Sequence, residues 1–300
     1  MFNRKAKDAS LAMEVQQRSR TFWEDVWYRF IRNNKTIIGL VMLALVFLLC
    51  LYGMIFLDYE TEVINQDIPN RLQTPCAEHI FGTDDLGRDI FNRIAYGARY
   101  SLFIGFSSTI ASLTIGSILG CIAGYFGGKT DNIIMRLTDV FIAIPSTLLA
   151  IAVVSALGPN FFNLIISIAI GDIPGYVRII RSSVLSIKDN EFVEASVAVG
   201  GSSAHIMAQH IFPNTLAALI VQATLGVGYV IIAASGLSYL GLGVMPPAPE
   251  WGAMLSEAQA HIRYYPHQMI FPGLAIIVTV LALNLLGDAL RDAIDPTLKD

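Results

Sequence analysis

Six apolar runs, each about as long as a bilayer is thick, dominate the sequence. They cover residues 36–57, 102–126, 133–157, 161–180, 215–240 and 269–286. A helix needs about 20 apolar residues to cross the hydrocarbon core, where no water is present to pair with backbone N–H and C=O groups. Charge is scarce as well, because Asp, Glu, Lys and Arg make up 15% of the chain, against about 25% in soluble domains. The sequence therefore predicts an all-α membrane protein with six transmembrane helices.

The polar composition narrows the partners that such a chain is expected to have. The formal net charge is −4, which gives no reason to expect binding to nucleic acid. Three cysteines do not amount to a disulfide framework. The first 35 residues or so are polar and charged, so they do not resemble a cleavable signal peptide.

The N-terminal segment 1–36 is basic and precedes the first apolar run. Within it, residues 21–31 alternate aromatic and charged side chains at roughly helical spacing. That pattern predicts an amphipathic helix lying on the membrane lipids at the interface. The alternative is a tail that serves only to orient the first span.

The distribution of basic residues predicts the orientation. With the N-terminus in the cytoplasm, fifteen of the twenty Lys and Arg residues fall on the inner side and five on the outer side. Basic loops stay in the cytoplasm, so both termini and the segment 188–214 are expected there. The segment 58–100 is then an extracytoplasmic loop, and the outer five are Arg71, Arg88, Arg93, Arg99 and Arg263.

Three spans carry features that a plain lipid-facing helix does not need. Small residues repeat as Gly116, Gly120 and Gly124, a ridge that lets another helix approach closely. Pro145 predicts a kink in the run 133–157. Asp172 lies inside the run 161–180, where a carboxylate is costly unless it faces a hydrated cavity, a cationic partner or another helix. Asp172 is therefore either a residue that lines a transport pathway or a structural hydrogen-bond partner.

The polar segment 188–214 separates two apolar runs and has its own helical pattern. Residues 191–199 have helical composition, and the glycine pair Gly200–Gly201 is expected to end that helix. Ser202 and Ser203 are suited to cap a second short helix, and Pro213 is suited to open the following span. The segment is predicted to be a helix–turn–helix elbow at a membrane surface.

This elbow resembles the EAA signature of ATP-binding-cassette (ABC) importer permeases. The matching residues are Glu194-Ala195-Ser196, then Gly200, then Ile211-Phe212-Pro213-Asn214, with Ser196 and Phe212 as mild departures. In that family the elbow docks in a cleft on a cytoplasmic ATPase subunit. The resemblance implies that the ATPase-coupling residues are Glu191, Glu194, Ala195, Ser196, Gly200, Gly201, His210 and Pro213.

Three further stretches resemble the branch of these permeases for dipeptides, oligopeptides, glutathione and nickel, and within it the second permease subunit. They are the block 81–89 (FGTDDLGRD), the loop 240–252 with its PPAPEWG sequence, and the tail 284–296 (NLLGDALRD…DP). Thr83, Asp84 and Asp85 are suited to cap a short external helix, and the Pro-rich loop is expected to present Trp251 at the outer interface. The expected contacts with a binding protein or partner permease are Asp84, Asp85, Arg88, Asp89 and Trp251. The alternative is that these stretches only cover the helix bundle.

The resemblance implies a fold, a function and a set of partners. The fold is the type I ABC importer permease (MetI-like) fold, with residues 37–300 as the permease domain. The chain is expected in the bacterial inner membrane with a second homologous permease, two ATPase subunits and an extracytoplasmic substrate-binding protein. The expected substrates are di- or oligopeptides, with glutathione, nickel or another small solute as alternatives.

Enzyme chemistry and cofactors are not expected in this chain, and no metal site is indicated. ATP and Mg would bind the partner ATPases. The stretch 123–130 fits a loose phosphate-loop pattern but lacks the strand and helix that such a loop requires. An intramembrane aspartyl protease needs a second aspartate motif on another span, and no other predicted span of this sequence carries one to pair with Asp172. A secondary transporter is less favoured, because it would normally show an interrupted span in each half.

Overall fold

The computed structural model describes residues 21–294, and helices account for nearly all of its regular structure. No β-strand occurs within that range, apart from one isolated bridge between Thr83 and Asp89. The α-helices are α2 (Phe22–Arg32), α3 (Asn34–Phe56), α4 (Ile90–Phe126), α5 (Gly128–Ile142), α6 (Ser146–Leu157), α7 (Phe161–Ile187), α8 (Glu191–Ala198), α9 (Ser203–Ile206), α10 (Phe212–Tyr239), α11 (Trp251–Ala258) and α12 (His267–Ile294). The all-α prediction is confirmed.

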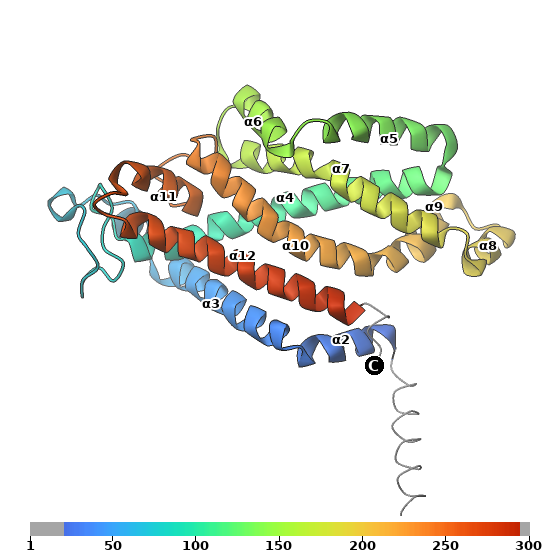
Figure 1. The fold of residues 1–300 in the computed structure, drawn as a ribbon, viewed down its shortest axis with the longest axis horizontal. Coiled ribbons are helices and arrows are strands. Elements are labelled where there is room, and N and C mark those ends of the chain that lie inside the picture. The colour runs from blue at the N-terminus through green and yellow to red at the C-terminus, as the bar shows by residue number, and fades with distance from the viewer. Residues whose placement is uncertain (1–20, 295–300) are drawn as a thin grey trace, which may run out of the picture.

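Five helical segments within the described range are long and apolar enough to cross a membrane. They are α3, α4, α7, the continuous segment 203–239 that ends in α10, and α12, which lie alongside one another in Figure 1. The sixth predicted span is broken, because α5 and α6 meet at an angle of 86°. Pro145 stands at this break as the N-cap of α6. Proline has no N–H to donate and its ring obstructs the preceding turn, so the predicted kink is a sharp bend.

The predicted glycine ridge brings α4 and α7 together. A Cβ atom added to Gly116 would lie 2.5 Å from Cβ of Tyr176, and one added to Gly124 would lie 2.8 Å from Cβ of Val184. Gly120 is equally tight against α7. Real side chains do not pack at such distances, so the close approach of the two backbones requires these glycines.

The remaining long helices complete the bundle around α4. A buried cluster joins α3, α4, α10, α11 and α12 through residues such as Ile94, Ile231 and Trp251. A second cluster joins α4, α6, α7 and α10. The bundle therefore positions α7 and α10 side by side, with α6 on their outer side (Figure 1).

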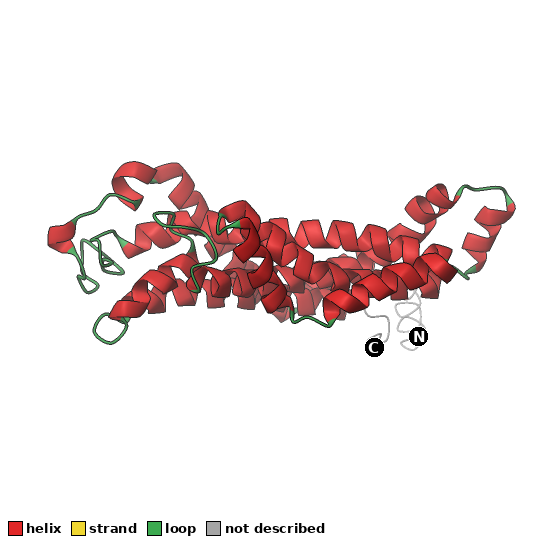
Figure 2. Cartoon of the chain, turned by 90° about the horizontal axis from the view of Figure 1, so that it is seen from above, coloured by secondary structure: helices red, strands yellow, loops and turns green. Residues whose placement is uncertain are grey.

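The two ends of the bundle differ in structure. At one end lie α2, α8 and α9, and the segment from α8 to α9 extends beyond the long helices (Figure 2). At the other end lie α11 and the loop 57–89, which contains a π-helical turn at Tyr59–Val63 and a 3-10 turn at Ile68–Asn70. We call these the elbow end and the capped end.

Two helix boundaries differ clearly from those expected. Helix α4 begins at Ile90, ten residues before the predicted end of the loop 58–100, and Asp89 caps it by accepting a hydrogen bond from the Asn92 backbone N–H. The expectation that Thr83, Asp84 and Asp85 cap this helix is therefore wrong. Helix α12 continues to Ile294, beyond the predicted end of the apolar run 269–286. Both extensions mix polar with apolar residues, so hydropathy alone placed the start of α4 too late and the end of α12 too early.

Helix α2 forms where the amphipathic interfacial helix was predicted, and its location at the membrane interface stays a prediction. Thr21 and Glu24 form a capping box at its start, with acidic residues in the first turn and basic residues in the last. That arrangement satisfies free N–H groups and complements the helix dipole. The first 20 residues of the predicted tail 1–36, and residues 295–300, lie outside the described range.

Candidate functional site

The elbow is a hairpin of short helices between α7 and α10. Helix α8 ends at Ala198, and Gly200 adopts a φ of 84°, a left-handed conformation that glycine reaches without steric cost. The Ser202 side chain then caps α9 by accepting a hydrogen bond from the His205 backbone N–H. A π-helical turn, Met207–Ile211, leads from α9 into α10. The predicted helix–turn–helix is confirmed.

The second glycine of the pair is required by crowding. The Gly201 backbone N–H donates to the Ser196 carbonyl at 3.0 Å. A Cβ on Gly201 would lie 2.8 Å from that same oxygen. Gly200 is needed for its backbone angle and Gly201 for its lack of a side chain, which gives each glycine a physical role.

The elbow is anchored by three buried aliphatic residues. Val193, Ile206 and Ile211 pack with residues of α4 and α7 in one cluster. The His210 ring lies 6.5 Å from the Phe192 ring, between centroids, and 5.7 Å from that of His205. The inner side of the elbow is therefore fixed to the bundle.

The outer side of the elbow is exposed and partly apolar. Of the predicted coupling residues, Glu191, Glu194, Ala195, Gly200 and Pro213 are exposed, whereas Ser196, Gly201 and His210 are half-buried. Beside them stand Phe192, Val197 and Val199, and Val199 is 86% exposed. Sequence reasoning missed these three residues, although apolar side chains in a polar segment were visible. Exposed apolar groups next to polar ones are typical of an interaction surface.

A second candidate site is a cavity of about 420 Å³ between α6, α7 and α10. Asp172 lies on its wall, with Tyr176 one helical turn further along α7. Tyr229 on α10 and Ser146 at the start of α6 complete the opposite side, with 3.2 Å between their hydroxyl oxygens. The prediction of a polar cavity at Asp172 agrees with this geometry, and the role of Asp172 in transport stays a prediction.

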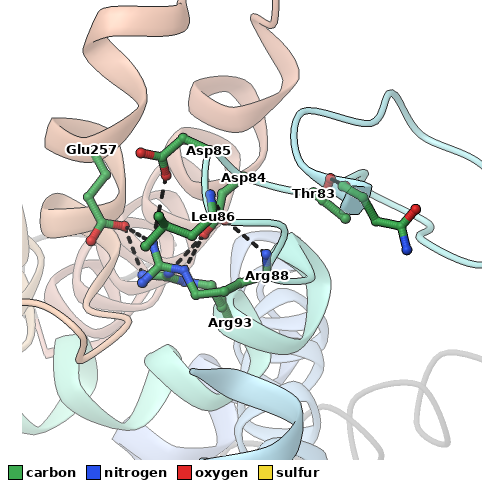
Figure 3. Close-up of polar contacts among 8 residues, drawn as sticks. Thr83, Asp84, Asp85, Leu86, Arg88, Arg93 and Glu257 are labelled. Atoms are coloured by element: carbon green, nitrogen blue, oxygen red, sulfur yellow. Dashed lines mark hydrogen bonds and ion pairs between the residues drawn. The ribbon is translucent and has the colours of Figure 1, made fainter. Parts of the chain in front are cut away.

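At the capped end, a charged network ties the loop to α11 (Figure 3). The Arg88 and Arg93 guanidinium groups lie between two carboxylates. Asp84 accepts from Arg88 Nε at 2.6 Å and from Arg93 Nη1 at 2.8 Å. Glu257 accepts from Arg88 Nη2 and Arg93 Nη2, each at 2.9 Å. Two cations thus face two anions, which is the balance that burial of charge requires.

The burial of this network corrects part of the predicted outer contact surface. Asp84 and Arg88 are buried, and Trp251 has no exposed area. Trp251 donates its indole N–H to the Ile94 carbonyl at 3.1 Å, so it does not stand at the outer surface. Burial of an aromatic ring as large as the indole of Trp251 is more favourable than its exposure to solvent. These three side chains hold the cap to the bundle.

Two of the predicted outer contacts remain partly accessible. Asp89 pairs with His79 at 2.7 Å, and Asp85 lies 3.9 Å from Arg88 with its side chain 36% exposed. Both residues stay predicted contacts. The structure therefore divides one sequence motif into buried members and accessible ones.

Sequence reasoning also missed the residues that complete this cap. Arg93 was named only as an outer basic residue, Glu250 was included only within the PPAPEWG sequence, and Glu257 was not named, although charged residues beside long apolar runs were a usable sign. Glu250 is fully buried, and its carboxylate accepts from the Ala253 backbone N–H at 2.9 Å and the Ser101 hydroxyl at 3.1 Å. Burial raises the pKa of the Glu250 carboxyl above its usual range. No group of three or more His, Cys, Asp or Glu side chains within residues 21–294 is placed to hold a metal ion.

Two family models match the sequence. A model described as "Binding-protein-dependent transport system inner membrane component" matches residues 116–300. A model described as "N-terminal TM domain of oligopeptide transport permease C" matches residues 21–75. The first covers the elbow and the Asp172 cavity.

Curated relatives align along nearly the whole chain. The dipeptide transport system permease protein DppC of Alkalihalophilus pseudofirmus is 45% identical over 277 residues, which cover 92% of this chain and 90% of the relative. The glutathione transport system permease protein GsiD of Pectobacterium atrosepticum is 41% identical over 299 residues, 99% of each chain. Its counterpart from Escherichia coli O6:K15:H31 is 42% identical over 301 residues.

A solved structure shares the fold. An inward-facing structure of the MetNI methionine ABC transporter matches with a TM-score of 0.56 and 19% sequence identity, over 68% of this chain and 96% of that one. At that identity the likeness concerns the fold alone. It agrees with the expected type I importer permease fold.

Proposed function

Because the chain belongs to the family of inner membrane components of binding-protein-dependent transport systems, we propose that it is the permease subunit through which an ATP-driven importer carries small peptides. The chain is a multi-pass inner-membrane permease of the ABC importer class. The observation that carries the substrate class is its 45% identity to a dipeptide permease over 92% of its length. The substrate enters the membrane only after delivery by a binding protein on the capped side.

The partners proposed are those that this mechanism needs. A second homologous permease completes the pathway, and two ATPase subunits supply the energy by binding and hydrolysing ATP with Mg. The chain itself performs no catalysis. We place the elbow and both termini in the cytoplasm, because most Lys and Arg residues lie in the segments on that side.

The elbow is the proposed coupling element. Its exposed outer side carries Ala195 and Val199, while its inner side is anchored to α4 and α7. An ATPase that closes on the outer side would therefore move the helices to which the inner side is fixed. The glycine pair sets the angle between α8 and α9, which determines how the outer side is presented.

The test is transport by a reconstituted complex. The chain is purified with the products of neighbouring genes and placed in vesicles with the binding protein and a radiolabelled dipeptide. ATP-dependent uptake that requires both the ATPases and the binding protein is the expected result. Uptake by this chain alone, driven by a proton gradient, would show a secondary transporter instead.

A second candidate substrate is glutathione. Relatives named as glutathione permeases align over 99% or more of this chain at 41–42% identity. The same vesicles, loaded in parallel with labelled glutathione and labelled dipeptide, distinguish the two. A preference for glutathione would keep the importer class and replace the substrate.

A further inference from the structure

The cavity between α6, α7 and α10 contains a carboxylate, Asp172, that pairs with no other residue in the described part of the chain. Among the described residues, no hydrogen bond and no ion pair reaches Asp172. The side chain is partly buried on the cavity wall. A carboxylate inside a membrane span is costly without a partner, so an external partner is expected.

Nearby cations do not supply that partner. Arg178 is bound to Asp139 at 2.6 Å, and Arg181 holds Asp131 with two hydrogen bonds of 2.5 and 2.6 Å. Both arginines point from α7 to α5, and neither lines the cavity. The cavity therefore presents one negative charge and no positive one.

The other polar groups are arranged to accept a bound cation. Ser146 and Tyr229 supply hydroxyl oxygens on the wall opposite α7, and Gln222 supplies an amide. The Tyr176 hydroxyl lies against the backbone of α10, where a Cβ on Gly226 would be 2.5 Å from its oxygen. Three of the nine lining residues are glycines, which leaves room beside the carboxylate. Tyrosine rings also attract ammonium groups through their faces.

We propose that the cavity of Asp172, Tyr176, Tyr229, Ser146 and Gln222 is a recognition subsite for the protonated primary amine of the transported solute. The inference rests on the proposed function for the identity of that solute. A dipeptide and glutathione both carry such an amine, so one subsite would serve either substrate. Asp172 pairs with the ammonium, and the hydroxyl and amide oxygens accept its remaining N–H groups.

The size and ligand set fit an organic ammonium group better than a bare metal ion. The cavity of about 420 Å³ is in the range of small-molecule sites, which is roughly 300–1,000 Å³. Calcium and magnesium are surrounded by about six or more oxygens, commonly from several carboxylates. Asp172 is the only charged side chain on this wall among the described residues.

The first experiment measures the charge preference of the cavity directly. A single cysteine is placed by Gln222→Cys in the complete importer, with Cys50→Ala, Cys76→Ser and Cys121→Ala. Its rate of modification is measured with 2-aminoethyl methanethiosulfonate, a primary ammonium, and with the neutral 2-hydroxyethyl reagent. Thr224→Cys is the matched control, because Thr224 lies two residues along α10 and lines a different, apolar groove.

The ratio of ammonium to neutral rates is expected to be about ten-fold higher at Gln222→Cys than at Thr224→Cys, since the nearby Asp172 carboxylate attracts a cationic reagent. Asp172→Asn should abolish the difference and Asp172→Glu should retain it. Equal ratios at the two positions with Asp172 present would overturn the proposal.

A second measurement needs no change at Asp172 and so survives any failure of the Asn variant to assemble. Glycinamide, an ammonium without a carboxylate, should slow the reaction of Gln222→Cys with the neutral reagent, whereas N-acetylglycinamide should not. Equal protection by the two, or none by either, would contradict an ammonium subsite.

These experiments test the ammonium subsite independently of the proposed peptide substrate. A preference for the ammonium reagent in an importer that takes up no dipeptide would retain the subsite and reject the peptide substrate. Dipeptide uptake without that preference would retain the substrate and reject the subsite.

Discussion

The capped end and the elbow end are both polar, and both carry motifs of the permease family, but they are built in opposite ways. At the capped end, charge is buried: Arg93 is 1% exposed and is held by two carboxylates. At the elbow, charge is exposed and apolar side chains stand beside it, with Val199 86% exposed. Buried charge fixes one arrangement, whereas exposed apolar surface is typical of docking sites. The capped end is therefore held in one arrangement by buried ion pairs, whereas the elbow has the exposed apolar surface that the proposed ATPase contact requires.

The largest expected effect is the loss of one charge from the buried network. Arg93→Met leaves Asp84 and Glu257 to share Arg88, and removing one member of a buried ion network costs about 3–5 kcal/mol. The midpoint of thermal unfolding of the purified importer should fall sharply. Arg71→Met is the matched control, because Arg71 is exposed in the adjacent loop, and it should change stability by less than about 0.5 kcal/mol. Equal effects of the two variants would show that the network does not hold the cap.

The two ends can be compared at two glycines that share a left-handed backbone conformation. Gly87 and Gly200 have φ angles of 79° and 84°. A Cβ on Gly87 would collide with the Asp67 carbonyl oxygen, whereas nothing lies within 4 Å of one on Gly200. Gly200→Ala should cost about 1 kcal/mol from backbone strain alone, and Gly87→Ala about 2 kcal/mol or more, because overpacking is added.

Thermal unfolding of the two alanine variants, side by side, measures this difference. A larger loss for Gly200→Ala than for Gly87→Ala would reverse the assignment of rigid and open ends.

The elbow should respond in transport and not in stability. Ala195 is exposed, so Ala195→Arg should fold normally but obstruct an ATPase that docks there. A misfit of about 1.4 kcal/mol or more would lower complex formation ten-fold, and uptake should fall at least as far. Ala195→Ser keeps the small size and should retain uptake. Full uptake by Ala195→Arg would remove this face from the coupling contact.

The sidedness of the two ends is tested by labelling one exposed cysteine at each end. Cys76 is exposed in the loop of the capped end, so the unaltered chain should react with an impermeant thiol reagent in intact cells whose outer membrane, if present, is permeabilised. Ser202→Cys at the exposed elbow, combined with Cys76→Ser, should react only after lysis. Thr83 is unsuitable for the same purpose because it is fully buried. The reverse labelling pattern would invert the proposed topology.

Much of the fold was predictable because its causes are local. Each span requires about 20 apolar residues regardless of its neighbours, and α3, α7, α10 and α12 lie where the apolar runs predict them. The elbow was also predictable, since Gly200 and Ser202 determine a turn and a cap through their own backbone and side chain. The start of α4 and the end of α12 were harder to predict, because Ile90–Tyr100 and the residues after Leu286 are helical but mix polar with apolar side chains.

The sequence by itself determined the spans, the elbow and the family, since these depend on residue type and short spacing. Only the tertiary structure decided which motif residues are buried. Arg88 meets Glu257 across 169 positions, and Ser146 meets Tyr229 across 83, distances over which no local pattern records a contact. Trp251 could be assigned to a surface or to a core from its chemistry alone, and the packing of α11 against α4 places it in the core. For the same reason the sequence could mark Asp172 as costly, while the cavity that makes it a candidate binding group exists only where α6, α7 and α10 come together.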